Sequence, residues 1–560
     1  MAPASMGYLP RTEAGTGAGW IIAWALLVSA GAAELPPVNV PETGPPALSQ
    51  TNFVGEFRFV GNQVFSAAEL ARVTLPWTGR MLKPLELEEA RLAVSTWYIS
   101  HGYVNSGAVL ENAAVVAGVV TLRVVEGSLA KISLQGNRWL SESFYRRRLL
   151  ANGGRPLNVN AVRDTLQLWR DLYPVEQVNA DIQPGPARGE ALMNLKVKER
   201  FPYHLGLTYA NNRPPSTGAE QLDAELEVES LTGRGDQLSL DYGVARASGN
   251  LMNRSRGLAG RDLAASYALP FTARDTSLRL QYGRNSAAVV EAPFQQLDIS
   301  SELESYTVAV SHPLYRTPTR ELSLALSGER RANQTYLLGE PYSILPGAVD
   351  GLSVVAVTRL TAQVTDRGPA HVFGARVSLS KGWDALGATA YHGEPHENLI
   401  PRDREFVAVL MQAQYLRRLG QSRVEFLARL AGQYSPDSLL ALEQLAIGGA
   451  QSVRGYRENT MARDKGLLAT AELRVPLWMG KDSAPKLQWV PFVDGGAGWN
   501  NGDGQPSLSS ISSAGMGLVF RLRKNLEASL FWGHAFRALH YSSHNLQDDG
   551  IHFHLSVWAF

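Results

Sequence analysis

The 560-residue chain contains no cysteine, carries almost no net charge and has no long apolar run after its first 33 residues. The absence of cysteine excludes a disulfide framework, a thiolate nucleophile and a cysteine-ligated metal. The 53 basic and 52 acidic residues nearly cancel, which removes any global electrostatic argument for a nucleic-acid partner. No later run reaches the roughly 18 consecutive apolar residues of a helical membrane span, so the chain would enter a membrane only as a closed β-barrel.

The N-terminus has the pattern of a secretory signal peptide. An apolar run, Trp20–Ala30, follows Arg11 and leads into the small residues 31–33. This run is too short to span a bilayer, and small residues at its end are typical of a cleavage site. We therefore expect residues 1–33 to be a signal peptide, with a buried helix as the alternative. The proline-rich segment 34–51 is expected to be an extended linker.

Residues 52–200 contain a repeated pattern of two units of about 75 residues each. Each unit begins with an alternating strand, a Gly-Asn turn and a serine positioned to cap a helix, at 57–66 and at 132–141. Each then has helical patterning and closes on a strand. We interpret them as two β-α-α-β-β domains, 52–127 and 128–200, with a single α+β domain as the alternative.

One predicted helix in the first unit runs from Leu85 to Ile99. Its periodicity suggests that Leu85, Ala90, Leu92 and Trp97 face the core. The corresponding helix of the second unit is predicted at Val159–Leu172.

From residue 201 to 560 the hydrophobic pattern changes to period two. Apolar residues alternate with polar or small ones in about sixteen runs of roughly ten residues, a pattern typical of a bacterial outer-membrane barrel. The other face of these runs is too polar for a packed core, since it includes Asp241, Arg279, Gln281, Glu425, Arg429 and Glu527. We therefore predict an all-β transmembrane barrel of about 16 antiparallel strands at 201–560, with a soluble sandwich as the alternative.

Two short motifs near the C-terminal end are the strongest functional candidates. They consist of Val453, Arg454, Gly455 and Tyr456, and of Phe492, Asp494, Gly495 and Gly496. An arginine in a glycine-flanked loop and an aspartate in a glycine-rich strand can form a buried ion pair, because a buried charge is tolerated only when it is paired. The segment from Tyr434 to Lys465 is far longer than a hairpin requires, which indicates a functional loop.

Catalytic and metal-binding patterns are weak. His552 and His554 share a strand face but lack a carboxylate partner at metal-ligand spacing. No nucleophile-elbow pattern arranges the serine, histidine and aspartate residues into a triad. We therefore expect no enzyme activity, no cofactor and no metal.

The chain resembles a known family in both of its parts. The N-terminal units look like two POTRA (polypeptide-transport-associated) domains, a likeness carried by G-N-x-x-F-S at 61–66, H-G-Y-V at 101–104 and L-R-V-V-E-G at 122–127. The barrel resembles that of two-partner secretion translocators (TpsB), the haemolysin and filamentous-haemagglutinin secretion-activation family of the outer-membrane assembly factor superfamily. This likeness is carried by L-T-G-R-G-D at 231–236, V-R-G-Y at 453–456 and F-V-D-G-G at 492–496.

The resemblance implies a location, a mechanism and a set of partners. The barrel would lie in the cell outer membrane, and the POTRA domains would capture an unfolded exoprotein in the periplasm for passage through the barrel. The long loop would fold back into the barrel, where Arg454 would pair with Asp494 as a loop-to-wall lock, and Gly495 and Gly496 would leave room for it. Outer-membrane lipid and the barrel assembly machinery are further implied partners, with Phe560 as the assembly signal.

Two alternative functions and one departure stay open at this point. A factor that inserts other barrels shares the superfamily's loop and wall motifs, whereas a passive porin would leave the periplasmic pair unexplained. Many family members begin with a helix that threads the barrel. The segment 34–51 is too short for that helix and its linker, so we expect no such plug.

Overall fold

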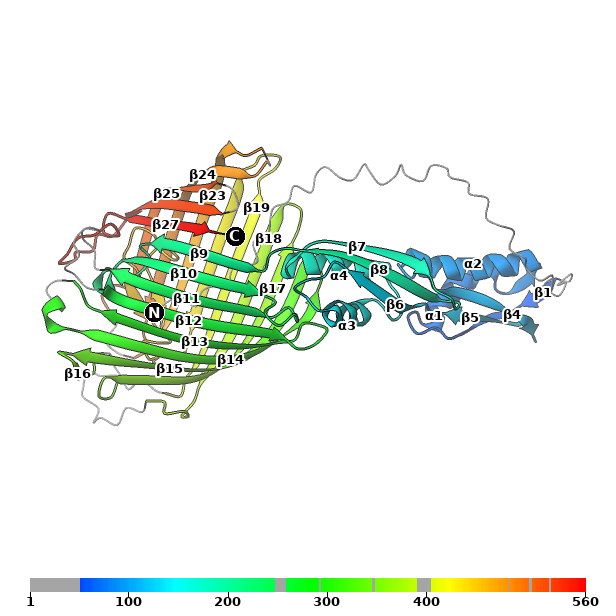
Figure 1. Ribbon diagram of the computed structural model, residues 1–560, viewed down its shortest axis with the longest axis horizontal. Coiled ribbons are helices and arrows are strands. Elements are labelled where there is room, and N and C mark those ends of the chain that lie inside the picture. The colour runs from blue at the N-terminus through cyan, green and yellow to red at the C-terminus, as the bar shows by residue number, and fades with distance from the viewer. Residues whose placement is uncertain are drawn as a thin grey trace. The chain divides into compact units, whose positions relative to one another are not determined.

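The computed structural model describes residues 51–246, 258–291, 294–344, 348–389, 404–481, 483–502, 506–522 and 525–559. They form two compact units, one ending at Arg200 and one beginning at Phe201 (Figure 1). Among the described residues, no helix has the length and apolar character needed to cross a membrane. The expected signal peptide, nearly all of the expected linker and Phe560 lie outside the described residues.

The N-terminal unit contains two small α+β structures that share the order β-α-α-β-β, to which the first adds the short paired strands β1 and β3. The first consists of β1 (Asn52–Val54), β2 (Glu56–Val60), α1 (Ala67–Thr74), η1 (Leu75–Trp77), β3 (Arg80–Leu82), α2 (Pro84–Ser100), β4 (Gly107–Val116) and β5 (Val119–Val125). The second consists of β6 (Ser128–Gln135), α3 (Glu142–Asn152), α4 (Val159–Leu172), β7 (Val175–Pro184) and β8 (Glu190–Glu199). Their sheets have the orders β2-β5-β4 and β6-β8-β7, each with a parallel first pair. Each of the two structures has its own apolar core.

A carboxylate holds the Gly-Asn turn of each repeat. Glu126, directly after β5, accepts hydrogen bonds from the Tyr98 hydroxyl at 2.9 Å and from two backbone N–H groups of residues 63–64. Glu199, the last residue of β8, accepts from the Tyr145 hydroxyl at 2.7 Å and from the N–H groups of residues 138–140. Charge-assisted acceptors of this kind satisfy turn donors that would otherwise need water. The sequence repeat therefore corresponds to one structural device used twice.

Helix α2 presents to the core a face that only partly matches the predicted one. Leu85 and Leu92 are 71% and 48% exposed, whereas Leu87, Ala90 and Val94 are buried. Ala90, which is buried, and Trp97, which packs partly buried against the same core, belong to both the predicted and the observed face. Because the helix carries large apolar residues on both sides, periodicity alone could not select the buried one.

Within the described residues, sixteen strands form a closed antiparallel barrel, which confirms the predicted architecture. They are β9 (Tyr203–Ala210), β10 (Glu220–Glu229), β11 (Gln237–Arg246), β12 (Leu258–Pro270), β13 (Ser277–Ala288), β14 (Ser300–Arg316), β15 (Arg320–Leu337), β17 (Leu352–Arg367), β18 (His371–Gly382), β19 (Val407–Arg418), β20 (Glu425–Tyr434), β23 (Lys465–Met479), β24 (Pro485–Trp499), β25 (Ser510–Leu522), β26 (Leu526–Ala535) and β27 (Ile551–Trp558). The two-residue β16 (Glu340–Pro341) extends β15. The seam between β27 and β9 closes the barrel through five residue pairs.

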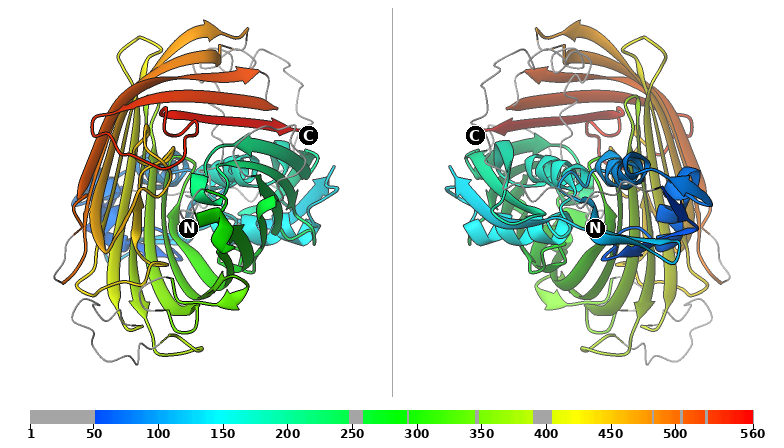
Figure 2. Two further views of the ribbon diagram at one scale, coloured as in Figure 1. Left: turned by 90° about the vertical axis from the view of Figure 1, so that its left-hand side faces the viewer. Right: turned by 90° about the vertical axis from the view of Figure 1, so that its right-hand side faces the viewer.

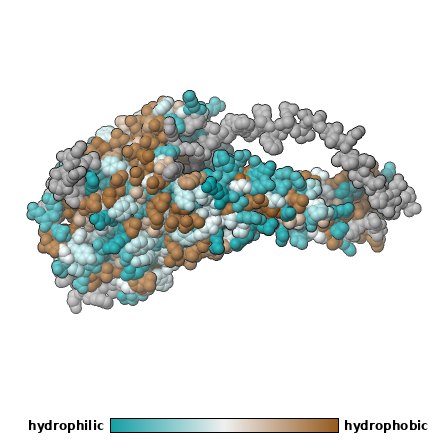
Figure 3. Space-filling model, viewed as in Figure 1, coloured by the Kyte–Doolittle hydropathy of each residue, from teal (hydrophilic) through white to brown (hydrophobic). Residues whose placement is uncertain are grey.

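The barrel strands are apolar on one face, as the period-two pattern predicts. Leu240, Leu280 and Leu326 are 40%, 45% and 55% exposed on β11, β13 and β15. Large apolar side chains exposed at alternate positions are typical of a barrel with an apolar outer surface. Figure 3 shows hydrophobic residues gathered over the barrel strands.

Four connections at one end of the barrel matter for the site. Because the strands alternate in direction, the connections after β9, β13, β20 and β26 all leave the barrel at the same end. We call the described residues of 211–219, 289–299 and 536–550 the outer loops, and residues 435–464 the long loop. The long loop contains a short hairpin of β21 (Leu445–Ile447) and β22 (Met461–Arg463). Figure 2 shows this segment within the ring of strands.

Candidate functional site

The tip of the long loop carries the first sequence motif and is buried. The loop begins after β20 ends at Tyr434 and finishes where β23 begins at Lys465. Val453, Arg454 and Tyr456 in the tip are no more than 3% exposed. A loop with this much burial is packed against protein and not extended into solvent.

Arg454 and Asp494 form a buried, bidentate ion pair. Nε of Arg454 donates to Oδ2 of Asp494 at 2.7 Å, and Nη2 donates to Oδ1 at 2.8 Å. The backbone N–H of Arg454 donates to the same Oδ2 at 3.1 Å. Both side chains are at most 4% exposed. The loop is thus attached to β24 by a planar fork, a geometry that arginine provides and lysine does not.

Glu472 on β23 is a second carboxylate partner for Arg454. The Nη1 atom of Arg454 lies 3.1 Å from Oε1 of Glu472. Glu472 also contacts Arg429 and, at 3.6 Å, Arg474. Its role was not predicted, although Glu472 lies directly opposite Phe492 in the β23–β24 pairing. A charged residue opposite the motif on the neighbouring strand could have indicated this second partner of Arg454.

An aromatic ring covers the face of the Arg454 guanidinium. Cζ of Arg454 lies 3.6 Å from the ring centroid of Phe492 and 5.0 Å from that of Phe531. Phe492 is 4% exposed. The guanidinium is therefore bonded at its edge by carboxylates and stacked on its face by a ring.

Glycines allow the close approach of the loop, but not all those predicted. Gly455 has a φ of +91°, and a Cβ there would lie 2.7 Å from the carbonyl oxygen of Gly533. A Cβ on Gly496 would lie 2.6 Å from the Ile447 side chain of the loop, whereas one on Gly495 would meet nothing within 4 Å. Successive strand residues point to opposite faces, so Gly496 lies under the loop and Gly495 does not.

The remaining residues of the tip are also held in place. Val453 belongs to an apolar cluster with Ile447 and Ile511. The Tyr456 hydroxyl donates to the carbonyl of Ser512 and accepts from the N–H of Arg537, both at 3.1 Å.

His552 contacts the loop backbone. Its Nε2 accepts a hydrogen bond from the Gly455 N–H at 3.3 Å, and the side chain is 2% exposed. Across the described residues, no group of three or more histidine, cysteine or acidic side chains is placed to hold a metal ion. The geometry of His552 is that of an acceptor for the tip.

The base of the long loop is anchored with the opposite polarity. Glu443, on the loop, accepts from Nη2 of Arg359 on β17 at 2.8 Å and pairs with Arg331 on β15. Arg331 also donates to the carbonyl of Leu442 at 2.7 Å. The carboxylate is on the loop here and the arginines are on the wall. The long loop is therefore tied to the strands β15 and β17 at its base and to β23 and β24 at its tip.

Comparisons with known proteins identify the family of this chain. The model of the haemolysin secretion/activation protein family ShlB/FhaC/HecB matches residues 189–520, and the ShlB-type POTRA domain model matches residues 53–127. The outer membrane transporter CdiB of Dickeya dadantii (strain 3937) is 26% identical, covering 84% of this chain and 80% of the relative. The hemolysin transporter protein ShlB of Serratia marcescens is 25% identical, covering 62% of this chain and 59% of the relative.

The solved structures support the fold. CdiB from Escherichia coli superposes with a TM-score of 0.72 at 22% identity and covers 94% of both chains. BamA from Haemophilus ducreyi, lacking POTRA domains 1–3, gives a TM-score of 0.52 at 15% identity. The family model covers more than half of the chain. The protein therefore belongs to the haemolysin secretion/activation protein family ShlB/FhaC/HecB, as an outer-membrane β-barrel transporter with periplasmic POTRA domains.

Proposed function

We propose that this protein secretes one large partner exoprotein through its barrel and that the Arg454–Asp494 pair positions the long loop during transport. The observation that carries the proposal is the burial of the loop tip against the barrel strands, with Arg454 only 3% exposed. A polypeptide that passes through the barrel needs the space that this loop occupies. The loop therefore has to shift, and the ion pair defines the position to which it returns.

The periplasmic domains would capture the client before it reaches the barrel. Their sheet orders place β2 and β4 at the edges of one sheet, and β6 and β7 at the edges of the other. An extended client segment can add to such an edge through backbone hydrogen bonds, independently of its detailed sequence. This mode suits an unfolded partner.

Lipid and the barrel assembly machinery are further partners in this proposal. The exposed apolar side chains of the barrel strands provide a surface suited to the hydrocarbon core of the outer membrane. The C-terminal Phe560, which lies outside the described residues, would be read by the assembly machinery during insertion.

A secretion assay in the native host tests the proposal. Asp494→Asn removes the charge that pairs with Arg454, and breaking a buried pair from one side is strongly destabilising. We expect the exoprotein to be absent from the medium while heat-modifiable electrophoretic mobility shows a folded barrel. Asp384→Asn is the matched control, because that carboxylate is 50% exposed. Normal secretion by a folded Asp494→Asn barrel would contradict the role of the pair.

The alternative of an assembly factor predicts a different result. Deleting the protein would then lower the levels of many outer-membrane barrels. Under the secretion proposal, deletion removes one exoprotein from the medium and leaves the other barrels at their normal levels.

A further inference from the structure

The tip of the long loop carries a second arginine whose contacts differ from those of Arg454. The fork of Arg457 binds Asp548, with Nε to Oδ1 at 2.6 Å and Nη2 to Oδ2 at 2.8 Å. Its Nη1 donates to Oε1 of Glu291 at 2.7 Å, and Nη2 also donates to the carbonyl of Ser543 at 2.8 Å. Cζ lies 3.7 Å from the ring centroid of Tyr541. All five donors of a guanidinium lie in one plane, and this one is surrounded by acceptors and a ring.

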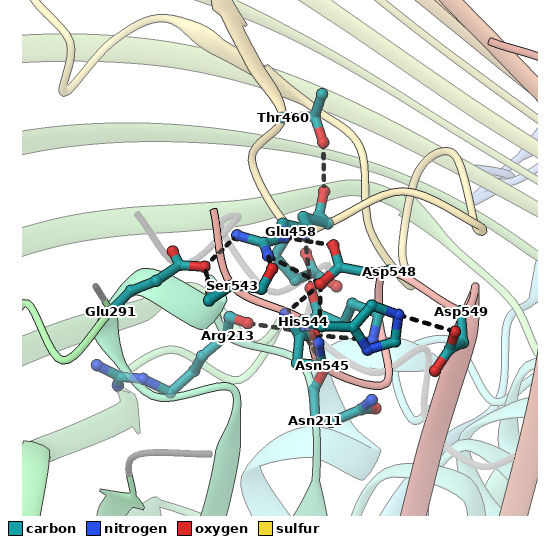
Figure 4. Close-up of polar contacts among 12 residues, drawn as sticks. Asn211, Arg213, Glu291, Glu458, Thr460, Ser543, His544, Asn545, Asp548 and Asp549 are labelled. Atoms are coloured by element: carbon teal, nitrogen blue, oxygen red, sulfur yellow. Dashed lines mark hydrogen bonds and ion pairs between the residues drawn. The ribbon is translucent and has the colours of Figure 1, made fainter. Parts of the chain in front are cut away.

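These partners come from the outer loops and not from the barrel strands. Glu291 belongs to the outer loop 289–299, whereas Ser543 and Asp548 belong to the outer loop 536–550. Figure 4 shows Glu291, Ser543 and Asp548 converging on this point. Arg454 and Arg457 therefore connect the same tip to two different sets of elements: Arg454 contacts the barrel strands, and Arg457 contacts the outer loops.

A fully buried glutamine extends the connection to the third outer loop. Gln547 donates through Nε2 to the carbonyls of Asn211 at 2.7 Å and Arg213 at 2.8 Å. Its Oε1 accepts from the N–H of Glu458 at 2.9 Å. Gln547 is 0% exposed. Four loops of the same barrel end thus meet at the tip of the long loop.

The charges at this junction depend on Arg457. Its side chain is 7% exposed, and those of Glu291 and Asp548 are 14% and 11% exposed. One guanidinium neutralises part of the charge of two largely buried carboxylates. Without it, the carboxylates would repel each other and hydrate, which requires the loops to separate.

We propose that Arg457 is a positioning residue that closes the outer mouth of the barrel by holding the outer loops against the tip of the long loop. This inference rests on the proposed transport function and assigns the two arginines separate tasks. Arg454 attaches the long loop to the barrel strands, and Arg457 attaches the outer loops to the tip of the long loop. Two of the outer loops flank the β27–β9 seam, and the third connects β13 and β14. Loss of the Arg457 contacts therefore frees all three outer loops from the tip of the long loop.

Conductance of the purified full-length protein in planar lipid bilayers tests the inference without any client. Arg457→Gln should raise the fraction of time in conducting states by about tenfold or more, because a buried pair is lost from the closed state only. Glu291→Gln keeps the Asp548 fork and should have a smaller effect. Arg537→Gln is the matched control, since this exposed side chain lies in the same outer loop and the substitution keeps the backbone N–H that donates to Tyr456.

Exchanging the charges of Arg457 and Asp548 distinguishes the loss of this ion pair from a general destabilisation of the barrel. Arg457→Asp alone should conduct most, and adding Asp548→Arg should lower conduction by restoring an ion pair with reversed direction. Unchanged conductance of a heat-modifiable Arg457→Gln barrel would overturn the inference, as would failure of the exchange to lower conduction. If the outer mouth opens as expected but no exoprotein is secreted by the wild type, the secretion proposal fails and the closing role of Arg457 stands.

Discussion

Cζ of Arg454 lies 3.6 Å from the centroid of the Phe492 ring, so the loop arginine rests on a residue of the same strand that carries its carboxylate partner Asp494. The two residues of β24 are separated by one position and therefore share a face. The spacing F-x-D provides a stacking surface and a bidentate acceptor for one guanidinium. This relationship explains why the wall motif contains an aromatic residue as well as an aspartate.

Removing the ring should loosen the lock without breaking the ion pair. Cation–π contacts contribute about 0.5–2 kcal/mol, so Phe492→Leu should increase the released fraction of the loop by roughly 2- to 30-fold. The chain contains no cysteine, so Val453→Cys introduces a single labelling site without background. Val453 is 0% exposed, so a cysteine there reacts only when the loop leaves its position. The rate of maleimide labelling measures release.

Phe531→Leu provides the graded control, because its ring centroid is 5.0 Å from Cζ of Arg454. It should increase labelling less than Phe492→Leu. Equal labelling of Phe492→Leu and the parent would show that the ring does not stabilise the locked position.

Alanine substitutions at two glycines, one in the loop motif and one in the β24 motif, test which backbone positions the buried loop needs. Gly455→Ala adds a Cβ at a φ of +91° and 2.7 Å from the Gly533 carbonyl oxygen, and strained backbone of this kind costs roughly 1–3 kcal/mol. We expect secretion to fall sharply. Gly495→Ala adds a Cβ that meets nothing within 4 Å, and secretion should stay normal. A defect of equal size in both variants would contradict the placement of the loop on the Gly496 face of the strand.

Much of the architecture followed from local patterns. The alternation along strands such as β11 and β13 specifies a sheet with two different faces, and the Gly-Asn turns specify the repeat, because both features are set by neighbours in sequence. Helix α2 was placed correctly, but Leu85 and Leu92 were assigned to the wrong face. That choice depends on which side the sheet covers, which is a tertiary property.

The partners of the loop were harder to predict for the same reason. Arg454 and Asp494 stand in glycine-rich motifs, whereas Glu472 and Glu443 occupy ordinary sequence. Their contacts join residues up to 112 positions apart, as for Arg331 and Glu443. Only the folded barrel brings Glu443 to its arginines, so no local pattern identifies it, whereas Glu472 is signalled only by its position opposite Phe492 in the β23–β24 hairpin.

The two anchors of the long loop should act independently. Glu443 contacts Arg331 and Arg359, and neither of these is a partner of Asp494. Glu329 also pairs with both arginines, at 3.1 and 3.2 Å, so Glu443→Gln leaves them partly compensated. We expect Glu443→Gln to raise Val453→Cys labelling less than Asp494→Asn.

A double-mutant cycle checks this independence. Effects at sites without shared partners add within about 0.5 kcal/mol, so the labelling free energies of Glu443→Gln and Asp494→Asn should sum in the double variant. A double variant no more labelled than Asp494→Asn alone would show that the base contributes nothing once the tip is free.

The tyrosine–glutamate pairs of the POTRA repeats predict a loss of stability at alkaline pH. Burial, and then the hydrogen bond to Glu126, raises the pKa of Tyr98 above its ordinary value, and burial together with Glu199 does the same for Tyr145. A folded-state pKa above the unfolded value of about 10 means that the stabilisation is complete below pH 10 and is lost as pH rises through the raised values. Pulse proteolysis of the full-length protein in urea should therefore show POTRA cleavage at lower urea above pH 10, with the barrel as internal reference.

In Tyr98→Phe/Tyr145→Phe, the lost hydrogen bonds lower the urea midpoint at pH 8, since each contributes roughly 1.5–3 kcal/mol when the acceptor is charged. The same variant removes both phenols, so its midpoint should change less between pH 9 and pH 11 than that of the parent; equal slopes would assign the alkaline sensitivity to other groups.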